Sequence, residues 1–209
     1  MDTLQENKSE TTGAGESLSI IELEGALLLE LLEGVSSHAS KDKSLPVLNA
    51  VELEGEGGIL TARATDRYRL IEGKASGREL EGSLDKALIP LEDIKRIIAL
   101  AKEHKSNLVS IMRAGNAVSV SSLGDSLNLT LREGSLPPVE HLFKASEGET
   151  VAVAGVAFNP AYFTDYAKIA GKGAAIKIYF TGNGKPMRVR ITSETISWRA
   201  LLMPMSYKD

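Results

Sequence analysis

The chain contains no cysteine among its 209 residues. Disulfides and thiolate metal sites are therefore excluded, and the composition fits a reducing compartment. No apolar run approaches the roughly 18 residues of a membrane-spanning helix. The N-terminus also lacks a basic start followed by an apolar stretch, so we expect no signal peptide. These absences favour a cytoplasmic protein without a membrane partner.

A strong charge of either sign is missing as well. The net charge is −4, and residues 1–17 contribute −3 of it. The rest of the chain is thus close to neutral, so a nucleic-acid partner would require cations concentrated on one face. Residues 1–17 are rich in Ser, Thr, Gly and Glu without an apolar period. We expect them to form a disordered tail.

The sequence does contain an internal repeat. A strand, a helix and three strands begin near Ser17, again near Ser83 and again near Thr150, with a period of about 66 residues. Each unit is too small to bury both faces of its sheet alone. We therefore expect units to stack on copies of themselves, within the chain or on neighbouring chains.

The first two units follow the same plan. In the first, Pro46 blocks further helix, and we expect a strand from Leu18, a Leu-rich helix over 26–35, and strands over 47–54, 59–65 and 69–75. In the second, apolar residues form one helical stripe after Pro90. The expected elements there are a strand at 87–89, a helix at 91–104, and strands at 107–113, 117–122 and 126–132.

The third unit begins with a β-branched segment, 151–158. Asn159 is a good N-cap, Pro160 a good first helical residue and Gly171 a good helix stop. Strands are expected at 176–181, 187–192 and 196–202. The pattern predicts three helices in all, because segment 136–144 starts Leu-Pro-Pro and favours a surface loop.

Local motifs now coincide with this plan. They are Leu48-Asn49, Ala-Thr-Asp-Arg-Tyr-Arg-Leu at 64–70, Leu-Arg-Glu-Gly-Ser-Leu-Pro-Pro at 131–138, Phe-Asn-Pro-x-Tyr at 158–162 and Leu-Met-Pro-Met at 202–205. In this order they resemble the bacterial DNA polymerase III beta subunit, the DNA sliding clamp. The resemblance covers roughly residues 18–205.

The resemblance implies an α+β DNA clamp fold. Three βαβββ units per chain would join copies into a closed ring, with sheets outside and helices lining the hole. Residues 18–145 would be one complete clamp domain, and residues 146–209 half of another. Because clamps of this family contain twelve units, four chains would close the ring. A trimer would need a fourth, degenerate unit within 105–158.

The implied function is that of a processivity factor. The ring would encircle duplex DNA without sequence specificity and tether replicative DNA polymerase, and whether a clamp loader opens it is left open. Loose attraction to phosphates would suffice. The candidate DNA contacts in the pore are Lys41, Lys43, Lys95, Arg96, Lys102, Lys105, Lys168 and Lys172. Interleaved carboxylates also fit an ordinary solvated face.

A second site implied by the family is a pocket for short apolar peptides of partner proteins. By motif position its residues are Leu48, Thr65, Arg67, Tyr68, Arg69, Leu70, Pro137, His141, Leu142, Leu201, Met203, Pro204 and Met205. Two flexible thioethers beside a proline suit varied peptides. The chain has Ser206 and His141 where the family usually has basic residues, so its partner motif is expected to differ.

Two alternative functions stand beside this one. Catalysis finds little support, because the three histidines show no metal-ligand spacing and no glycine-rich phosphate loop precedes a helix. Asp66 suits a strand turn better than a general base. We therefore expect a non-enzyme without cofactors. The other alternative is an adaptor that keeps the clamp fold without a ring and binds replication or repair proteins.

Overall fold

The computed structural model describes residues 18–145 and 155–206. Within them, strands and helices alternate in an α+β arrangement with two antiparallel sheets. No helix of this part of the chain is long and apolar enough to span a membrane. The predicted tail, 1–17, lies outside the described residues.

The smaller sheet has five strands in the order β5-β1-β7-β8-β9. Their bounds are β1 Leu18–Glu24, β5 Arg78–Glu81, β7 Leu108–Ala114, β8 Ala117–Ser122 and β9 Asp125–Thr130. β1 of the first unit therefore completes the sheet of the second unit. In return, β6 of the second unit pairs with β2 of the first. The two units therefore share strands and form one body.

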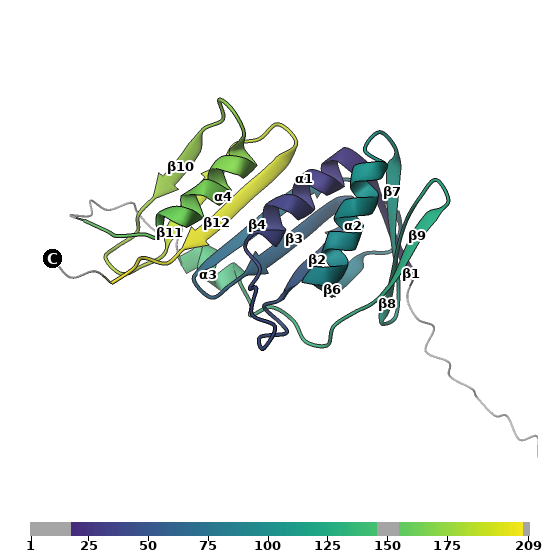
Figure 1. Ribbon diagram of the computed structural model, residues 1–209, viewed down its shortest axis with the longest axis horizontal. Coiled ribbons are helices and arrows are strands. Elements are labelled where there is room, and N and C mark those ends of the chain that lie inside the picture. Colours follow the sequence, from purple (N-terminus) through teal and green to yellow (C-terminus); the bar gives the residue numbers. More distant parts are fainter. Residues whose placement is uncertain (1–17, 146–154, 207–209) are drawn as a thin grey trace, which may run out of the picture.

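The larger sheet has seven strands in the order β10-β11-β12-β4-β3-β2-β6. Their bounds are β2 Ala50–Glu56, β3 Ile59–Thr65, β4 Arg69–Ser76, β6 Leu84–Pro90, β10 Ile176–Tyr179, β11 Met187–Ile191 and β12 Ile196–Leu202. The third unit thus extends the sheet of the first. Figure 1 shows β10 and β9 near opposite ends of the long axis.

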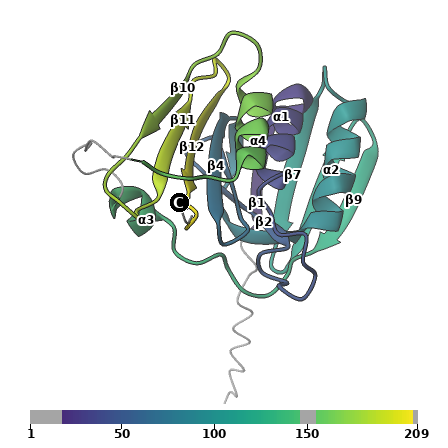
Figure 2. The same ribbon diagram turned by 60° about the vertical axis from the view of Figure 1, so that its left-hand side comes forward.

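Three helices lie side by side over one face of the larger sheet, as Figures 1 and 2 show. They are α1 Gly25–Ser36, α2 Leu91–Glu103 and α4 Pro160–Ala170. The middle helix, α1, touches both neighbours. The central position explains its leucine-rich sequence, because α1 buries seven residues whereas α4 buries only Tyr166.

The predicted caps of α4 are confirmed. The Oδ1 atom of Asn159 accepts a hydrogen bond from the Ala161 amide at 3.0 Å, Pro160 is the first helical residue, and Gly171 ends the helix with φ 71°. A positive φ favours glycine because it has no Cβ.

The structure corrects the sequence-based prediction at three places. Segment 136–144 is not only a loop, because α3 spans Glu140–Ala145 and brings the described helices to four. β5 was not predicted at all. Of the expected strand at 151–158, residues 151–154 lie outside the described residues, and the remainder holds one isolated bridge, from Ala157 to Met205.

Candidate functional site

The third unit joins the first through neighbouring strands. β12 pairs antiparallel with β4 over its full length, so both parts share one sheet. Trp198 of β12 is buried at this joint. A Cβ atom added at Gly34 or Gly73 would lie only 2.4 or 2.5 Å from its ring. The two glycines are therefore required for close packing of the indole.

A pocket of about 420 Å³ opens at one end of the joint. Its walls come from the turn between β3 and β4, from α3 and the segment before it, and from the end of β12. The lining residues are Leu48, Thr65, Arg67, Tyr68, Arg69, Leu70, Pro137, Val139, Leu142, Pro186, Leu201 and Met203. The structure thus brings together all but three of the residues assigned to the partner pocket by motif position.

α3 forms one wall of this pocket. Val139 and Phe143 are buried against Leu70 of β4 and Leu201 of β12, in a small cluster separate from the main core. Leu142 of the same helix lines the pocket and remains 40% exposed. An exposed leucine at a pocket mouth leaves apolar surface for a ligand to cover.

Arg199 holds α3 against the sheet. Its Nη2 atom donates to Oε2 of Glu140 at 2.6 Å, and its guanidinium lies 3.9 Å above the centre of the Phe143 ring. The Nε atom of Arg199 donates to Oε1 of Glu72 at 2.7 Å. The pocket wall is therefore tied to β4 and β12 by a charged hydrogen-bond network.

That network continues across the sheet. Glu52, Arg63, Glu72 and Arg199 stand opposite one another on β2, β3, β4 and β12. Arg63 Nε donates to Oε2 of Glu72 at 2.7 Å. Burial alone would raise the pKa of Glu72, but hydrogen bonds from Arg199 and Arg63 outweigh it and hold the pKa below its usual value.

Arg69, on the pocket floor, connects three segments. It donates from Nε to Oδ2 of Asp66 at 3.0 Å, from Nη1 to Oδ2 of Asp165 at 2.7 Å and from Nη2 to the Ser37 carbonyl at 2.6 Å. The same guanidinium lies 4.4 Å from the centre of the Tyr162 ring. The pocket floor is thereby fastened to α1 and α4.

Asp165 also faces Lys168 on the helix side, with 3.5 Å between Oδ1 and the Lys168 Nζ atom. Burial would raise the pKa of Asp165, but the hydrogen bond from Arg69 and its charge prevail and lower it. Asp165 therefore stays ionised and serves both the pocket and the helix face.

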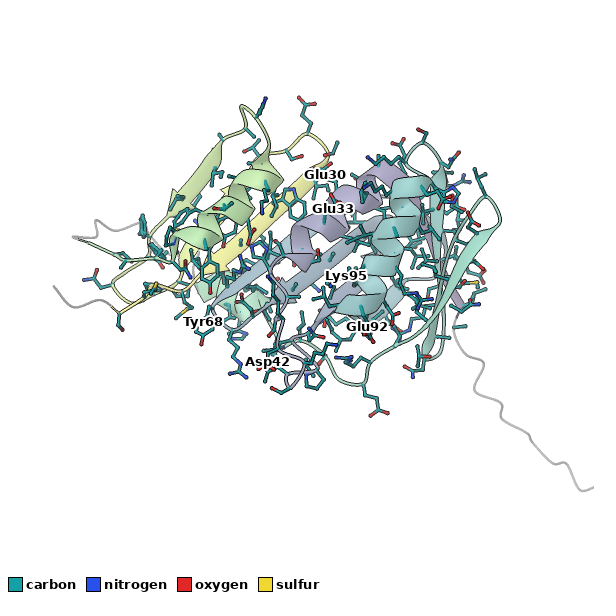
Figure 3. All side chains as sticks on the ribbon, in the orientation of Figure 1. Glu30, Glu33, Asp42, Tyr68, Glu92 and Lys95 are labelled. Carbon is teal, nitrogen blue, oxygen red and sulfur yellow. The ribbon has the colours of Figure 1, made fainter. Side chains whose placement is uncertain are left out.

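The turn between β3 and β4 shapes the rim of the pocket. Oδ1 of Asp66 accepts hydrogen bonds from the amides of Tyr68 at 3.1 Å and Arg69 at 3.0 Å, and the Thr65 hydroxyl donates to the Arg69 carbonyl at 2.7 Å. Arg67 has φ 81°, in the left-handed region. Tyr68 is 61% exposed, and Figure 3 shows it at the edge of the molecule.

Three residues assigned to the pocket lie elsewhere. His141 is exposed on α3 and does not line the pocket. Pro204 and Met205 line a neighbouring cavity of about 410 Å³, which shares Met203 with the pocket. His141 is exposed, whereas Val139 and Phe143 form the buried side of this segment.

Val139 and Pro186 line the pocket but were missed in the sequence. A signal for Val139 existed, because Val139, Leu142 and Phe143 have the i, i+3, i+4 spacing of one helix face. The Pro-Pro pair before them obscured that spacing. Pro186 precedes β11 and carries no comparable signal.

The cations assigned to DNA lie mainly on or next to the helices. Lys95, Arg96 and Lys102 are exposed on α2, and Figure 3 marks Lys95. Arg96 forms an ion pair with Asp93, with 2.7 Å between Nη1 and Oδ1. The other exposed cations of this set are Lys41 and Lys43 after α1, Lys105 after α2, Lys168 on α4 and Lys172 after it.

The helix face is not uniformly positive. α1 contains no basic residue and carries Glu30 and Glu33. Both line a crevice of about 360 Å³ shared with Asp165 and Lys168 of α4. The cations are therefore concentrated at α2 and the loops, whereas carboxylates dominate between α1 and α4.

Two of the histidines, His38 and His104, are buried. His38 is fully buried, and burial lowers its pKa to about 3, so a substrate cannot reach the neutral ring. Among the described residues, Glu103, His104 and Asp125 form one group with ligand atoms within 4.8 Å. Within this group, His104 Nε2 contacts Asp125 Oδ2 at 2.8 Å.

Comparison with known proteins supports the resemblance. No family model matches the chain. The beta sliding clamp of Micrococcus luteus is 28% identical over 160 residues, which cover 76% of this chain and 51% of the relative. A beta sliding clamp homolog, GriR, of Streptomyces muensis is 32% identical over 125 residues, or 58% of this chain and 33% of the homolog. The chain thus matches about half or less of these relatives.

Solved structures show the same fold. The DNA polymerase III beta subunit of Thermotoga maritima has a TM-score of 0.78 at 17% identity, covering 97% of this chain and 69% of that one. The polymerase sliding clamp of Bacillus subtilis has a TM-score of 0.72 at 21% identity, covering 90% and 64%. The resemblance to sliding clamps and the clamp fold of the chain are therefore confirmed.

Proposed function

We propose that the chain, whose fold is that of a sliding clamp, acts as a non-catalytic processivity factor for a DNA polymerase. Copies would form a closed ring around duplex DNA in the cytoplasm, and the pocket at the β4–β12 joint would hold an apolar peptide of the polymerase or another clamp-binding protein. The observation that carries this proposal is the pocket itself, because motifs far apart in sequence converge on one apolar cavity in a clamp fold.

The sheet edges support a ring. The edge strands are β5 and β9 in one sheet and β10 and β6 in the other. β5 is blunted by charges at three of its four positions, whereas β9 has only Asp125 and β10 only Lys177. β9 and β10 lie near opposite ends of the molecule (Figure 1). Pairing of β9 with β10 of the next copy would give head-to-tail closure.

The proposed ring contains four chains. The helices α1, α2 and α4, one from each unit, share one face of the larger sheet. With three units in each chain, four copies supply twelve units. A trimer would require a further βαβββ unit within 105–158, where the described residues hold β7, β8, β9 and α3. Native mass spectrometry tests the number. Four chains are expected, and a monomer at micromolar concentration would favour the adaptor.

Encirclement is tested by comparing retention of the protein on circular and on linear DNA. Protein bound to nicked circular DNA should survive washing in high salt, because a closed ring is held by linkage rather than by charge. Cutting the circle with a restriction enzyme should release it. If opening requires a clamp loader, the loader and ATP are added in the first step. Equal retention on circular and linear DNA would contradict the ring.

The proposed DNA contacts are tested by salt dependence. Replacing Lys95 and Lys102 together by Ala should reduce the slope of log K against log salt by about 2, since each phosphate contact contributes about one unit. Lys86→Ala, an exposed lysine on β6, is the matched control and should leave the slope unchanged. An unchanged slope in the double variant would place DNA elsewhere.

The pocket is tested with peptides selected by phage display on the full chain. Met203 and Leu142 are exposed at 41% and 40%, so replacing both by Glu should fill the pocket with charge without disturbing the core. Binding of the selected peptides should fall at least about tenfold. Replacing exposed Leu123 by Glu serves as the control.

A further inference from the structure

Arg67 is an unusual residue at the rim of the proposed pocket. It lines the cavity and is exposed, yet its φ of 81° lies in the left-handed region. A side chain with a Cβ is disfavoured there by about 1 kcal/mol or more. Glycine would adopt the same conformation without this cost.

The turn is held in place independently of the Arg67 side chain. Asp66 accepts from the amides of Tyr68 and Arg69 through one oxygen and from the Arg69 guanidinium through the other. The Arg67 amide donates to the Thr65 hydroxyl at 3.3 Å. The guanidinium of Arg67 is thus not required to build the turn.

The surroundings of the Arg67 guanidinium also differ from those of the Arg69 guanidinium. Arg69 is buried and paired with Asp66 and Asp165. Over the described part of the chain, no ion pair within 4.0 Å involves Arg67, and its charge acts only at longer range on exposed Asp42. Both oxygens of neighbouring Asp66 are already engaged. One exposed cation therefore stands beside a cavity whose other walls are largely apolar.

We infer that Arg67 selects partner peptides carrying a carboxylate next to their apolar anchor. This inference rests on the proposed peptide-binding function of the pocket. A side-chain carboxylate or the peptide's own C-terminus would accept a bidentate hydrogen bond from the exposed guanidinium. The apolar residues would be covered by Leu48, Leu142 and Met203, so the specific partner is an acidic, apolar peptide.

Peptides selected on the wild-type chain should contain Asp or Glu, or a free C-terminal carboxylate, beside Leu, Phe or Met. One such peptide and its carboxamide counterpart are then titrated by isothermal calorimetry. The wild type should favour the acid by about fivefold, the range of an exposed charge pair. Raising the salt to 1 M should remove most of this preference.

Two variants separate charge from backbone strain. Arg67→Gln removes the charge and keeps the strained conformation, so it should lose the preference without gaining stability. Arg67→Gly should lose the preference and raise the thermal midpoint by about 3 °C, because glycine relieves the strain. Arg67→Lys should keep part of the preference. Arg78→Gln, on exposed β5, should change neither quantity.

The outcomes distinguish this inference from the proposed function. If acid and amide bind the wild type equally, Arg67 does not select a carboxylate, although the pocket remains a peptide site. If a preference persists in Arg67→Gln, another residue supplies it and the inference is overturned. If no selected peptide loses affinity for the Leu142→Glu, Met203→Glu double variant, the pocket proposal itself fails.

Discussion

The joint between the first and third units and the outer flank of the third unit contrast sharply. At the joint, Trp198 is 3% exposed and packs against α1, where seven residues are buried. On the flank, α4 buries only Tyr166, and Ile178 of β10 is 41% exposed. The same repeated unit is thus well packed on one side and open on the other. The comparison indicates that stability resides at the joint, and that the flank is available to a neighbour.

The largest effect is expected at Trp198. Trp198→Ala should destabilise the chain by about 4 kcal/mol, because it removes a large buried side chain and leaves a cavity beside two glycines. Urea unfolding followed by circular dichroism measures this. A loss below about 1 kcal/mol would show that the joint contributes little to stability.

The next largest effect is expected in the charged network that joins Arg63, Glu72 and Arg199 across the larger sheet. Glu72→Gln should cost about 3 kcal/mol, because it leaves the partly buried Arg63 and Arg199 without their shared carboxylate. The folded pKa of Glu72 is lowered, so its contribution is present above the unfolded pKa and is lost as pH falls through the folded pKa. The variant should therefore lose less stability than the wild type upon acidification. Glu194→Gln, at an exposed position, is the control.

A pH effect at milder acidity is expected from His38. Its folded pKa of about 3 lies below the ordinary histidine value of 6.5, so the unfolded chain binds a proton first. Stability should therefore fall as pH drops below 6.5, by about 2 kcal/mol at pH 5. His38→Asn should flatten this part of the curve, whereas exposed His141→Asn should not. If the free energy of unfolding depends on pH in the same way in the wild type and both variants, a buried neutral His38 ring is contradicted.

The smallest effect is expected on the flank. Ile178→Thr should change the stability of the dilute chain by no more than about 0.5 kcal/mol, as is usual for surface sites. If the proposed ring forms, the same change should weaken association between copies, because β10 is the proposed pairing edge. A large loss of stability in the dilute chain, equal to the loss in the assembly, would show that other residues of the same chain cover Ile178.

Much of the fold was predictable because its signals are local. The helical stripe of α2 and the caps Asn159, Pro160 and Gly171 gave correct helices, and turn residues separated most strands. α3 was missed because Pro137 and Pro138 masked its short apolar stripe. β5 was missed because its exposed residues carry no alternation of apolar and polar positions.

The pocket was largely found through family motifs, whereas its energetics depend on long-range contacts. The Arg69–Asp165 hydrogen bond joins residues 96 positions apart, and no local pattern announces such a pair. On the helix face, the sequence predicted which residues are charged but not how the charges are arranged. Lysines were located correctly on α2, but only the structure shows that α1 places Glu30 and Glu33 in the middle of that face.

Trp198 is the single tryptophan of the chain, and it lies where the third unit meets the first. Its intrinsic fluorescence therefore reports on one place alone, without any attached dye. Separation of β12 from β4 would admit water to the indole and move its emission to longer wavelength. The protein thus contains its own fluorescent reporter for opening at this joint, and the emission of Trp198 can be followed in real time.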